Sequence, residues 1–166
     1  MANVLERTGE GLVLSRPKTF TDLKIGDSIC VSGACLSVVG MDDTMMSFDV
    51  VEETWRRTKL GGLHMGDKVN VERSMSAGGR FEVHIVQGHV EGVGEVLHNG
   101  AMIGGAEWIL AIKIPEDLLP AVIFKGSIAI DGVSLTVAGL EKEVCSIALI
   151  PHTLEITTLG KLKAGQ

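Results

Sequence analysis

The sequence predicts an all-β protein made of two similar small barrels, and two observations support this class. When the 166-residue chain is shifted by 99 residues, residues 26–66 align with residues 125–165 without a gap and match at 13 of 41 positions. This spacing exceeds the roughly 20 to 50 residues of a solenoid repeat, so it indicates a duplicated domain. The 21 glycines separate short runs rich in β-branched residues, which is typical of strands joined by tight turns.

The strands of the first copy are expected in three places. Ser32-Gly33 stands where a two-residue hairpin turn is expected, before a strand at residues 34–39. Further strands are expected at residues 45–50 and 68–72, with a short helix at residues 53–58 between them.

The second copy repeats this order. Strands are expected at residues 90–97 and 108–114, and then at residues 127–130 and 133–137 on either side of Asp131-Gly132, a strong signal for a tight hairpin. A strand at residues 144–149 and a helix at residues 151–157, with Pro151 in its first turn, complete the copy. Each unit is therefore expected to be a small antiparallel barrel with one short helix.

Comparison of the two copies also predicts that each lacks one strand. The counterparts of residues 88–96 would precede residue 1, and the counterparts of residues 69–72 would begin just past residue 166. An open barrel exposes unpaired strand edges, which proteins normally cover. We therefore expect either a truncated chain or another element that fills both gaps.

Composition restricts the classes of function. The chain is 45% hydrophobic and 22% charged, as in ordinary globular proteins. The net charge of −6 opposes phosphate binding, so nucleic acid is not an expected partner. No run reaches the ~20 apolar residues of a membrane helix, and no signal peptide is expected at the N-terminus. The three cysteines, an odd number in no paired spacing, favour a reduced cytoplasmic location.

The outer face of each predicted hairpin is a candidate ligand surface. Strand alternation directs Ala34, Leu36 and Val38 inward and Cys35, Ser37 and Val39 outward. In the duplicate, Val133, Leu135 and Val137 point inward, whereas Ser134, Thr136 and Ala138 point outward. Small polar side chains leave room for a flat ligand and offer hydroxyls that donate and accept hydrogen bonds. The alternative is an ordinary solvated sheet exterior.

Charged and metal-binding residue types offer few further candidates. His84 and His89 are five residues apart, and the chain has no CxxC or HxxxH motif, so no metal site is expected. His89, at the start of a predicted strand, is instead a candidate proton carrier. Arg56, Arg57 and Lys59 form a basic cluster that suits either a solvated helix face or an anion or ribityl contact.

Five segments carry a resemblance to a known family. They are Gly33-Ala34-Cys35-Leu36-Ser37-Val38, Val69-Asn70-Val71-Glu72-Arg73, Gly88-His89-Val90-Glu91-Gly92-Val93-Gly94, residues 125–137 and Ile150-Pro151-His152-Thr153-Leu154-Glu155. The chain resembles riboflavin synthase from about residue 22 onward. The resemblance implies two six-stranded Greek-key barrels related by duplication. We expect an N-terminal lumazine-binding barrel at residues 1–73, a linker at 74–83 and a C-terminal barrel at 84–166.

The resemblance also implies a reaction. In this family two molecules of 6,7-dimethyl-8-ribityllumazine exchange a four-carbon unit and give riboflavin and 5-amino-6-ribitylaminouracil, without metal or cofactor. Two copies of one domain suit a reaction between two copies of one substrate, because proximity supplies much of the acceleration. The family pairs the N-terminal barrel of one subunit with the C-terminal barrel of its neighbour in a homotrimer.

Site residues follow from the resemblance position by position. In the first barrel the substrate is expected to contact Cys35, Leu36, Ser37, Glu53, Thr54, Trp55, Arg56, Arg57 and Thr58. The remaining expected contacts are Gly88, His89, Val90, Lys125, Ser134, Leu135, Thr136, Ile150, Pro151, His152, Thr153, Leu154 and Glu155. Ser28, Cys35 and His89 are the candidates for proton transfer and for addition at C7 of the lumazine. A water molecule or a ribityl hydroxyl is an alternative nucleophile.

The sequence departs from the family pattern at both ends and before His84. The usual opening Met-Phe-Thr-Gly, the closing strand and the C-terminal helix are absent, and Glu82-Val83 stands where the family has Gly-Gly. Three hypotheses therefore remain: an active synthase, a non-catalytic lumazine- or flavin-binding protein, and an inactive fragment of a longer synthase.

Overall fold

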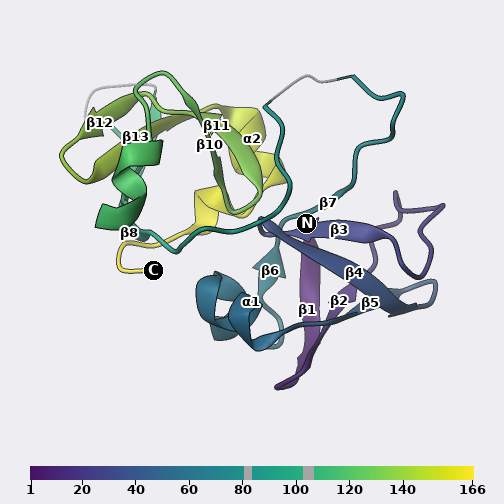
Figure 1. The fold of residues 1–166 in the computed structure, drawn as a ribbon. Helices are drawn as coiled ribbons and strands as arrows, with labels where there is room; N and C mark the ends of the chain where they lie inside the picture. The colour runs from purple at the N-terminus through teal and green to yellow at the C-terminus, as the bar shows by residue number, and fades with distance from the viewer. Residues whose placement is uncertain (81–83, 103–106) are drawn as a thin grey trace. The chain divides into compact units, whose positions relative to one another are not determined.

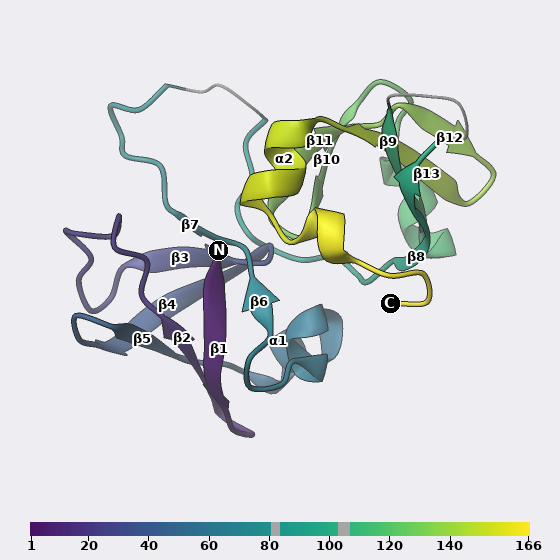
Figure 2. The ribbon, with the colours of Figure 1, turned by 180° about the vertical axis from the view of Figure 1, so that it is seen from behind.

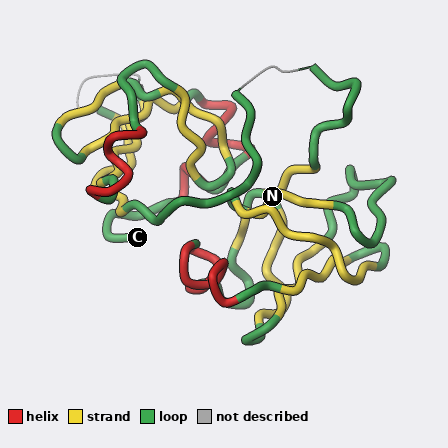
Figure 3. The backbone as a smooth tube through the Cα atoms, viewed as in Figure 1, coloured by secondary structure: helices red, strands yellow, loops and turns green. Residues whose placement is uncertain are grey.

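A computed structural model describes residues 1–80, 84–102 and 107–166. The chain divides into two compact units, Met1–Val90 and Glu91–Gln166. Residues 84–90, which were expected in the second barrel, group with the first unit. Strands and loops make up most of each unit and the helices are short (Figure 3). None of the helices in the described residues is long and apolar enough to cross a membrane.

The first unit is a curled seven-stranded sheet. Its strands are β1 (Ala2–Arg7), β2 (Gly11–Ser15), β3 (Ser28–Val31), β4 (Ala34–Met41), β5 (Met45–Asp49), β6 (Lys68–Val69) and β7 (Val71–Arg73). They are ordered β6-β1-β2-β5-β4-β3-β7, so the two end strands are consecutive in the chain. The sheet therefore closes on itself through Asn70. Helix α1 (Glu52–Arg57) and the 3₁₀ helix η1 (Lys59–Gly62) follow β5 (Figure 1).

The second unit repeats the arrangement with a divided sheet. Strands β8 (Glu95–Ala101), β9 (Trp108–Lys113), β12 (Gly139–Glu141) and β13 (Val144–Leu149) form a sheet ordered β12-β13-β9-β8. Strands β10 (Ser127–Ile130) and β11 (Val133–Thr136) form a separate hairpin. Its short helices are η2 (Glu116–Ala121), α2 (Pro151–Ile156) and η3 (Leu159–Lys161), seen from behind in Figure 2.

Both predicted hairpins are confirmed, and the backbone angles of their turns account for the glycine at the second turn position. Ser32 and Gly33 have φ of 46° and 95°, and Asp131 and Gly132 have φ of 54° and 76°. Positive φ at both central residues defines the type I′ turn, which favours glycine at its second position. The inward faces are as expected in the first unit, where Ile29, Val31, Ala34 and Leu36 are buried in the core. The corresponding residues of the second hairpin are half-buried.

Threonines that the two copies share end helices α1 and α2. The hydroxyl of Thr58 donates to the carbonyl of Thr54 at 2.7 Å and accepts from the amide of Leu60 at 3.2 Å. Thr157 makes the same pair of bonds with Thr153 and Leu159, at 2.6 and 3.3 Å. These bonds satisfy backbone groups where each α-helix gives way to a 3₁₀ turn. This shared role accounts for the presence of threonine at this position in both copies.

Several expected boundaries were wrong. The first copy does have an opening strand, β1, which pairs with β2 in the way that β8 pairs with β9 in the second copy. Strand β1 also pairs with β6. The strand expected at residues 90–97 begins only at Glu95, and residues 84–94 form no regular element. Residues 68–72 form two short strands, because β6 pairs with β1 and β7 pairs with β3 at the opposite end of the sheet order.

Candidate functional site

A cavity of about 360 Å³ lies in the first unit, within the ~300–1,000 Å³ typical of small-molecule sites. Three separate segments of the chain form its wall: the start of β4, helix α1 with its C-cap, and residues 88–90. The lining residues are Ala34, Cys35, Glu53, Thr54, Arg57, Thr58, Gly88, His89 and Val90. All but Ala34 were predicted as site residues from the sequence.

The segment at residues 88–90 reaches the cavity because it packs directly on β4. The amide of Cys35 donates a hydrogen bond to the carbonyl of Gly88 at 2.9 Å. Gly88 has φ of 75°, and a Cβ built on it would lie 2.7 Å from the Cβ of Cys35. Only glycine fits this approach without displacing backbone. The contact fixes His89 and Val90 beside Cys35, although they are far from it in sequence.

Helix α1 supplies the charged part of the wall. Glu52 and Glu53 occupy its first turn and Arg56 and Arg57 its last, which suits the helix dipole. The Glu53 carboxylate accepts from Arg57 Nε at 2.5 Å and also pairs with Arg56. Hydrogen bonds from Arg56, and next from Arg57, lower the pKa of the Glu53 carboxyl. The cavity therefore presents a paired carboxylate and guanidinium.

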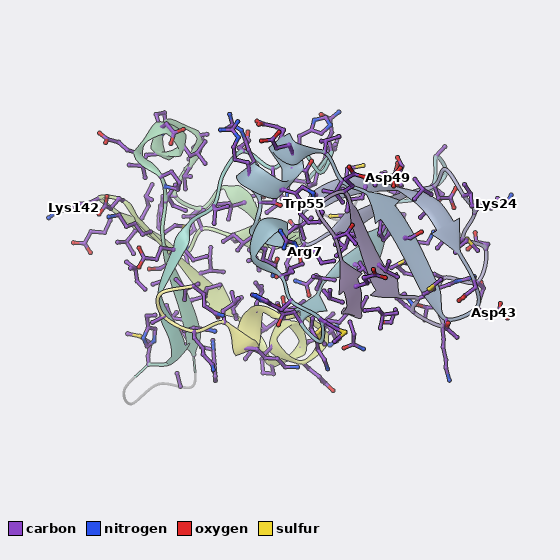
Figure 4. The ribbon with its side chains drawn as sticks, turned by 90° about the horizontal axis from the view of Figure 1, so that it is seen from below. Arg7, Lys24, Asp43, Asp49, Trp55 and Lys142 are labelled. Carbon is purple, nitrogen blue, oxygen red and sulfur yellow. The ribbon has the colours of Figure 1, made fainter. Side chains whose placement is uncertain are left out.

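Trp55 and Arg56 lie outside the cavity, although both were expected to contact substrate. The indole Nε1 of Trp55 donates to the carbonyl of Gly9 at 3.0 Å, and the guanidinium of Arg7 lies 5.0 Å from the centre of its ring. Figure 4 shows Arg7 and Trp55 next to each other. These contacts join helix α1 to the β1–β2 hairpin, so Trp55 positions the helix that lines the cavity.

Three more of the expected residues on the hairpin do not line the cavity. Leu36 is 5% exposed and belongs to the barrel core. Ser37 lies on the outer face opposite Ser28, because the two are partners in the β3–β4 register. The carbonyl of Ser28 accepts from the Ser74 hydroxyl at 3.1 Å. Of the three catalytic candidates, the cavity thus brings together Cys35 and His89.

The remaining expected contacts lie in the second unit. Ser134 and Thr136 are on β11, opposite Ala129 and Ser127, and Leu135 between them is half-buried. Lys125 has φ of 64°, and its amide donates to the carbonyl of Val137 at 3.0 Å. The expected segment at residues 150–155 covers the N-cap of α2 and most of that helix, in this order: Ile150, Pro151, His152, Thr153, Leu154 and Glu155.

The duplication relates this second set to the cavity. Ser134 and Thr153 occupy the positions of Cys35 and Thr54, so β11 and α2 correspond to the two elements that line the cavity in the first unit. Ile150 and Ile156, at the two ends of α2, are 61% and 52% exposed. Apolar side chains this exposed are suited to covering a ligand or another surface.

One lining residue was missed. Ala34 has a small inward side chain that is 3% exposed, so strand alternation assigned it to the core. Its atoms nevertheless border the cavity beside Cys35. The available signal was its position next to Cys35 and directly after a type I′ turn. Among the described residues, no cluster of three or more His, Cys, Asp or Glu side chains has the arrangement of a metal site.

Comparisons with known proteins give the same picture for both halves of the chain. The lumazine binding domain family matches residues 4–74 and again residues 87–166. Riboflavin synthase of Bacillus amyloliquefaciens is 41% identical over 163 residues, covering 97% of this chain and 75% of that protein. Riboflavin synthase of Actinobacillus pleuropneumoniae is 40% identical over 168 residues, with the same coverage.

Solved structures show the same fold. LumP complexed with riboflavin matches with a TM-score of 0.88 at 24% identity, covering 99% of this chain and 91% of that chain. LumP complexed with 6,7-dimethyl-8-(1'-D-ribityl) lumazine matches with a TM-score of 0.83 at 22% identity, covering 99% and 90%. With both copies matched and relatives near 40% identity aligned along most of its length, the chain belongs to the riboflavin synthase family.

Proposed function

We propose that this chain is a riboflavin synthase that converts two molecules of 6,7-dimethyl-8-ribityllumazine into riboflavin and 5-amino-6-ribitylaminouracil. The observation that carries the proposal is the cavity of the first unit, where Cys35, His89 and the polar side of helix α1 meet in a space of about 360 Å³. Relatives about 40% identical to the chain are riboflavin synthases, which supports the reaction class.

The chemistry requires two events that the cavity residues are suited to. A proton must leave the C7 methyl group of one lumazine, and a nucleophile must add at C7 of the other. Histidine is the commonest general base in enzymes, so we assign proton transfer to His89. Cys35 is exposed, lines the same cavity and bonds through its amide to Gly88 next to that histidine, so we assign it to nucleophilic addition or to its support. Ser28 is a weaker candidate because it does not line the cavity.

Helix α1 is proposed to bind the polar parts of the substrate. Arg57 and Thr54 both line the cavity, and their side chains carry donors suited to ribityl or pyrimidine oxygens. The pairing of Arg57 with Glu53 keeps this part of the wall nearly neutral, which suits an uncharged polyol.

We further propose that the second unit holds the second substrate with Lys125, Ser134, Leu135, Thr136 and residues 150–155. Ser134→Ala and Thr136→Val test this assignment, because both remove a hydroxyl from β11 without changing the core. Each is expected to weaken ligand binding about fivefold, the loss of roughly one hydrogen bond, while the chain stays folded. Unchanged affinity in both variants would show that this face does not bind the ligand.

The assembly and location are also proposals. A homotrimer would let the first unit of one subunit face the second unit of its neighbour, and two small barrels of this size benefit from such association. A cytoplasmic location fits three cysteines that form no disulfide in the structure.

The direct test is incubation of the chain with 6,7-dimethyl-8-ribityllumazine while riboflavin formation is followed by absorbance, alongside a fluorescence titration of binding. We expect one riboflavin for every two lumazines consumed. His89→Asn is expected to lower turnover strongly. The matched control is His98→Asn, which changes an exposed histidine on β8 of the other unit. Saturable binding without product would identify a lumazine-binding protein instead, and no binding at all would refute the ligand class.

A further inference from the structure

Two cysteines face each other across the β3–β4 hairpin. Cys30 and Cys35 are direct partners in the antiparallel register, each one residue beyond the Val31 and Ala34 pair that closes the turn. Ile29, Val31 and Ala34 are buried in the barrel, so alternation places both cysteines on the outer face of the sheet. The two thiols therefore lie on one face of neighbouring strands.

The hydrogen bonds identify the type of pair. The Cys35 amide donates to the carbonyl of Gly88 at 2.9 Å, away from β3. On the other strand, the amide of Ser32 donates to the carbonyl of Asn70 at 2.8 Å, away from β4. Amides two residues apart in a strand point the same way, so the amide of Cys30 also points away from β4. Cys30 and Cys35 are thus a non-hydrogen-bonded pair, whose Cα atoms are about 4.5 Å apart in antiparallel sheets. Disulfides need a Cα separation of about 4.4–6.8 Å.

We propose that Cys30 and Cys35 are a redox-active pair that closes to a disulfide and thereby changes the wall of the cavity. Cys35 is exposed and lines the cavity, so it is the thiol that an oxidant reaches first. Neither cysteine is in a disulfide in the structure, which therefore represents the reduced state.

The oxidant is a low-molecular-weight disulfide such as oxidised glutathione. The Cys35 thiolate attacks one sulfur of the oxidant, a mixed disulfide forms, and one equivalent of free thiolate leaves. The Cys30 thiolate then attacks the Cys35 sulfur of the mixed disulfide, and the second equivalent of thiol leaves. The protein loses two protons and two electrons, and one molecule of the oxidant is reduced to two thiols.

Closure affects the cavity because Cys35 is one of its lining side chains. The new bond draws Sγ along the sheet toward Cys30 and removes the thiol proton from the cavity. It also fixes the side chain on which Gly88 packs, since that glycine lies in direct contact with the Cys35 Cβ. This effect on ligand binding rests on the proposed function, whereas formation of the disulfide does not.

The other cysteine and the other hairpin provide controls. Cys145 is buried in the second unit, and burial raises the pKa of its thiol, so it is expected to react slowly with the oxidant. The second hairpin holds Ala129 and Ser134 at the equivalent pair of positions, in the same register. The pair of thiols is therefore a feature of the first hairpin that the duplication does not repeat.

Mass spectrometry tests the proposal directly. After treatment of the whole chain with oxidised glutathione, free thiols are alkylated and the protein is digested with trypsin. Residues 25–56 contain no internal lysine or arginine, so Cys30 and Cys35 lie in one tryptic peptide that excludes Cys145. We expect that peptide to lose the mass of two hydrogens and to carry no alkyl group, and dithiothreitol to restore two alkylation sites.

Variants separate the steps. Cys30→Ser is expected to stop at a glutathione adduct on Cys35, whereas Cys145→Ala is expected to oxidise like the parent chain. The double variant Ala129→Cys with Ser134→Cys is expected to close a second disulfide, because its positions share the register. Two alkylated cysteines in the parent peptide, or a stable glutathione adduct on it without closure, would overturn the proposal.

Ligand titration separates the disulfide from its effect. The oxidised chain is expected to bind 6,7-dimethyl-8-ribityllumazine about five- to tenfold more weakly than the reduced chain, the loss of about one hydrogen bond. Unchanged affinity with a proven disulfide would overturn the coupling to the cavity. Absence of binding by the reduced chain would instead refute the proposed function and leave the mass-spectrometric result unaffected.

Discussion

Gly88→Ala tests whether contact of residues 88–90 with β4 creates the binding cavity. Alanine at a left-handed φ of 75° costs about 1–2 kcal/mol. The added Cβ would also lie 2.7 Å from the Cβ and 2.9 Å from the amide nitrogen of Cys35, so the segment must move away. That movement breaks the bond from the Cys35 amide to Gly88, worth about 1 kcal/mol net. Together these terms oppose the docked position by about 2–3 kcal/mol.

We expect this energy to appear in two measurements. Each 1.4 kcal/mol is tenfold in an equilibrium constant, so lumazine affinity should fall about 30- to 140-fold. The amide of Cys35 should exchange its hydrogen faster by up to a comparable factor, because its acceptor is withdrawn. The sheet of the first unit should persist in the variant, since residues 84–90 form no strand in it and only Val90 of this segment packs against the core.

Gly78→Ala is the matched control. Gly78 has no heavy atom within 4 Å of an added Cβ and no left-handed φ, so this variant should behave like the parent chain. If Gly88→Ala binds lumazine with unchanged affinity and keeps the slow exchange of the Cys35 amide, the segment does not form the site and the reasoning is wrong.

Three further variants test the elements around the cavity. Trp55→Phe should lower the free energy of unfolding by about 1 kcal/mol through loss of the bond to Gly9, with lumazine affinity within twofold of the parent; a large loss of affinity at unchanged stability would show that Trp55 contacts the ligand. Thr58→Val should cost about 1–2 kcal/mol in chemical denaturation because it removes both bonds that end helix α1, and an unchanged midpoint would contradict that role. A hydrogen bond from the amide of Thr44 is the main reason that the pKa of Asp42 is lowered, so the contribution of Asp42 to stability is present above pH 3.8 and is lost as the pH falls through its lower pKa in the folded state. Asp42→Asn should therefore flatten the dependence of stability on acid pH in unfolding experiments, and an equally steep dependence would refute this role.

Local chemistry made the hairpins and helix ends predictable. Asp131-Gly132 specifies a type I′ turn because aspartate and glycine tolerate positive φ, and Ser32-Gly33 forms the same turn at the equivalent place. Thr58 and Thr157 end their helices through bonds to residues no more than four positions away. Such signals act within a few residues, so the sequence shows them directly.

The pairing of distant strands was not predictable in the same way. The short run at residues 68–72 divides because β6 pairs with β1 and β7 pairs with β3, and this division closes the barrel. No local pattern distinguishes one strand from two strands with different partners. The opening strand β1 was missed for a similar reason, since more residues separate β8 from β9 than separate β1 from β2, and this difference shifts the alignment between copies.

The sequence by itself determined the duplication, the two type I′ hairpins, the outward face that carries Cys35 and Ser134, and the family. Those features depend on residue spacing and on backbone preferences that act locally. Only the tertiary structure decided that Gly88 packs on Cys35 and brings His89 to helix α1, and that Trp55 and Leu36 serve the framework instead of the cavity. Such contacts join residues far apart in the sequence, so they depend on how the whole barrel closes and not on the local preferences of either segment.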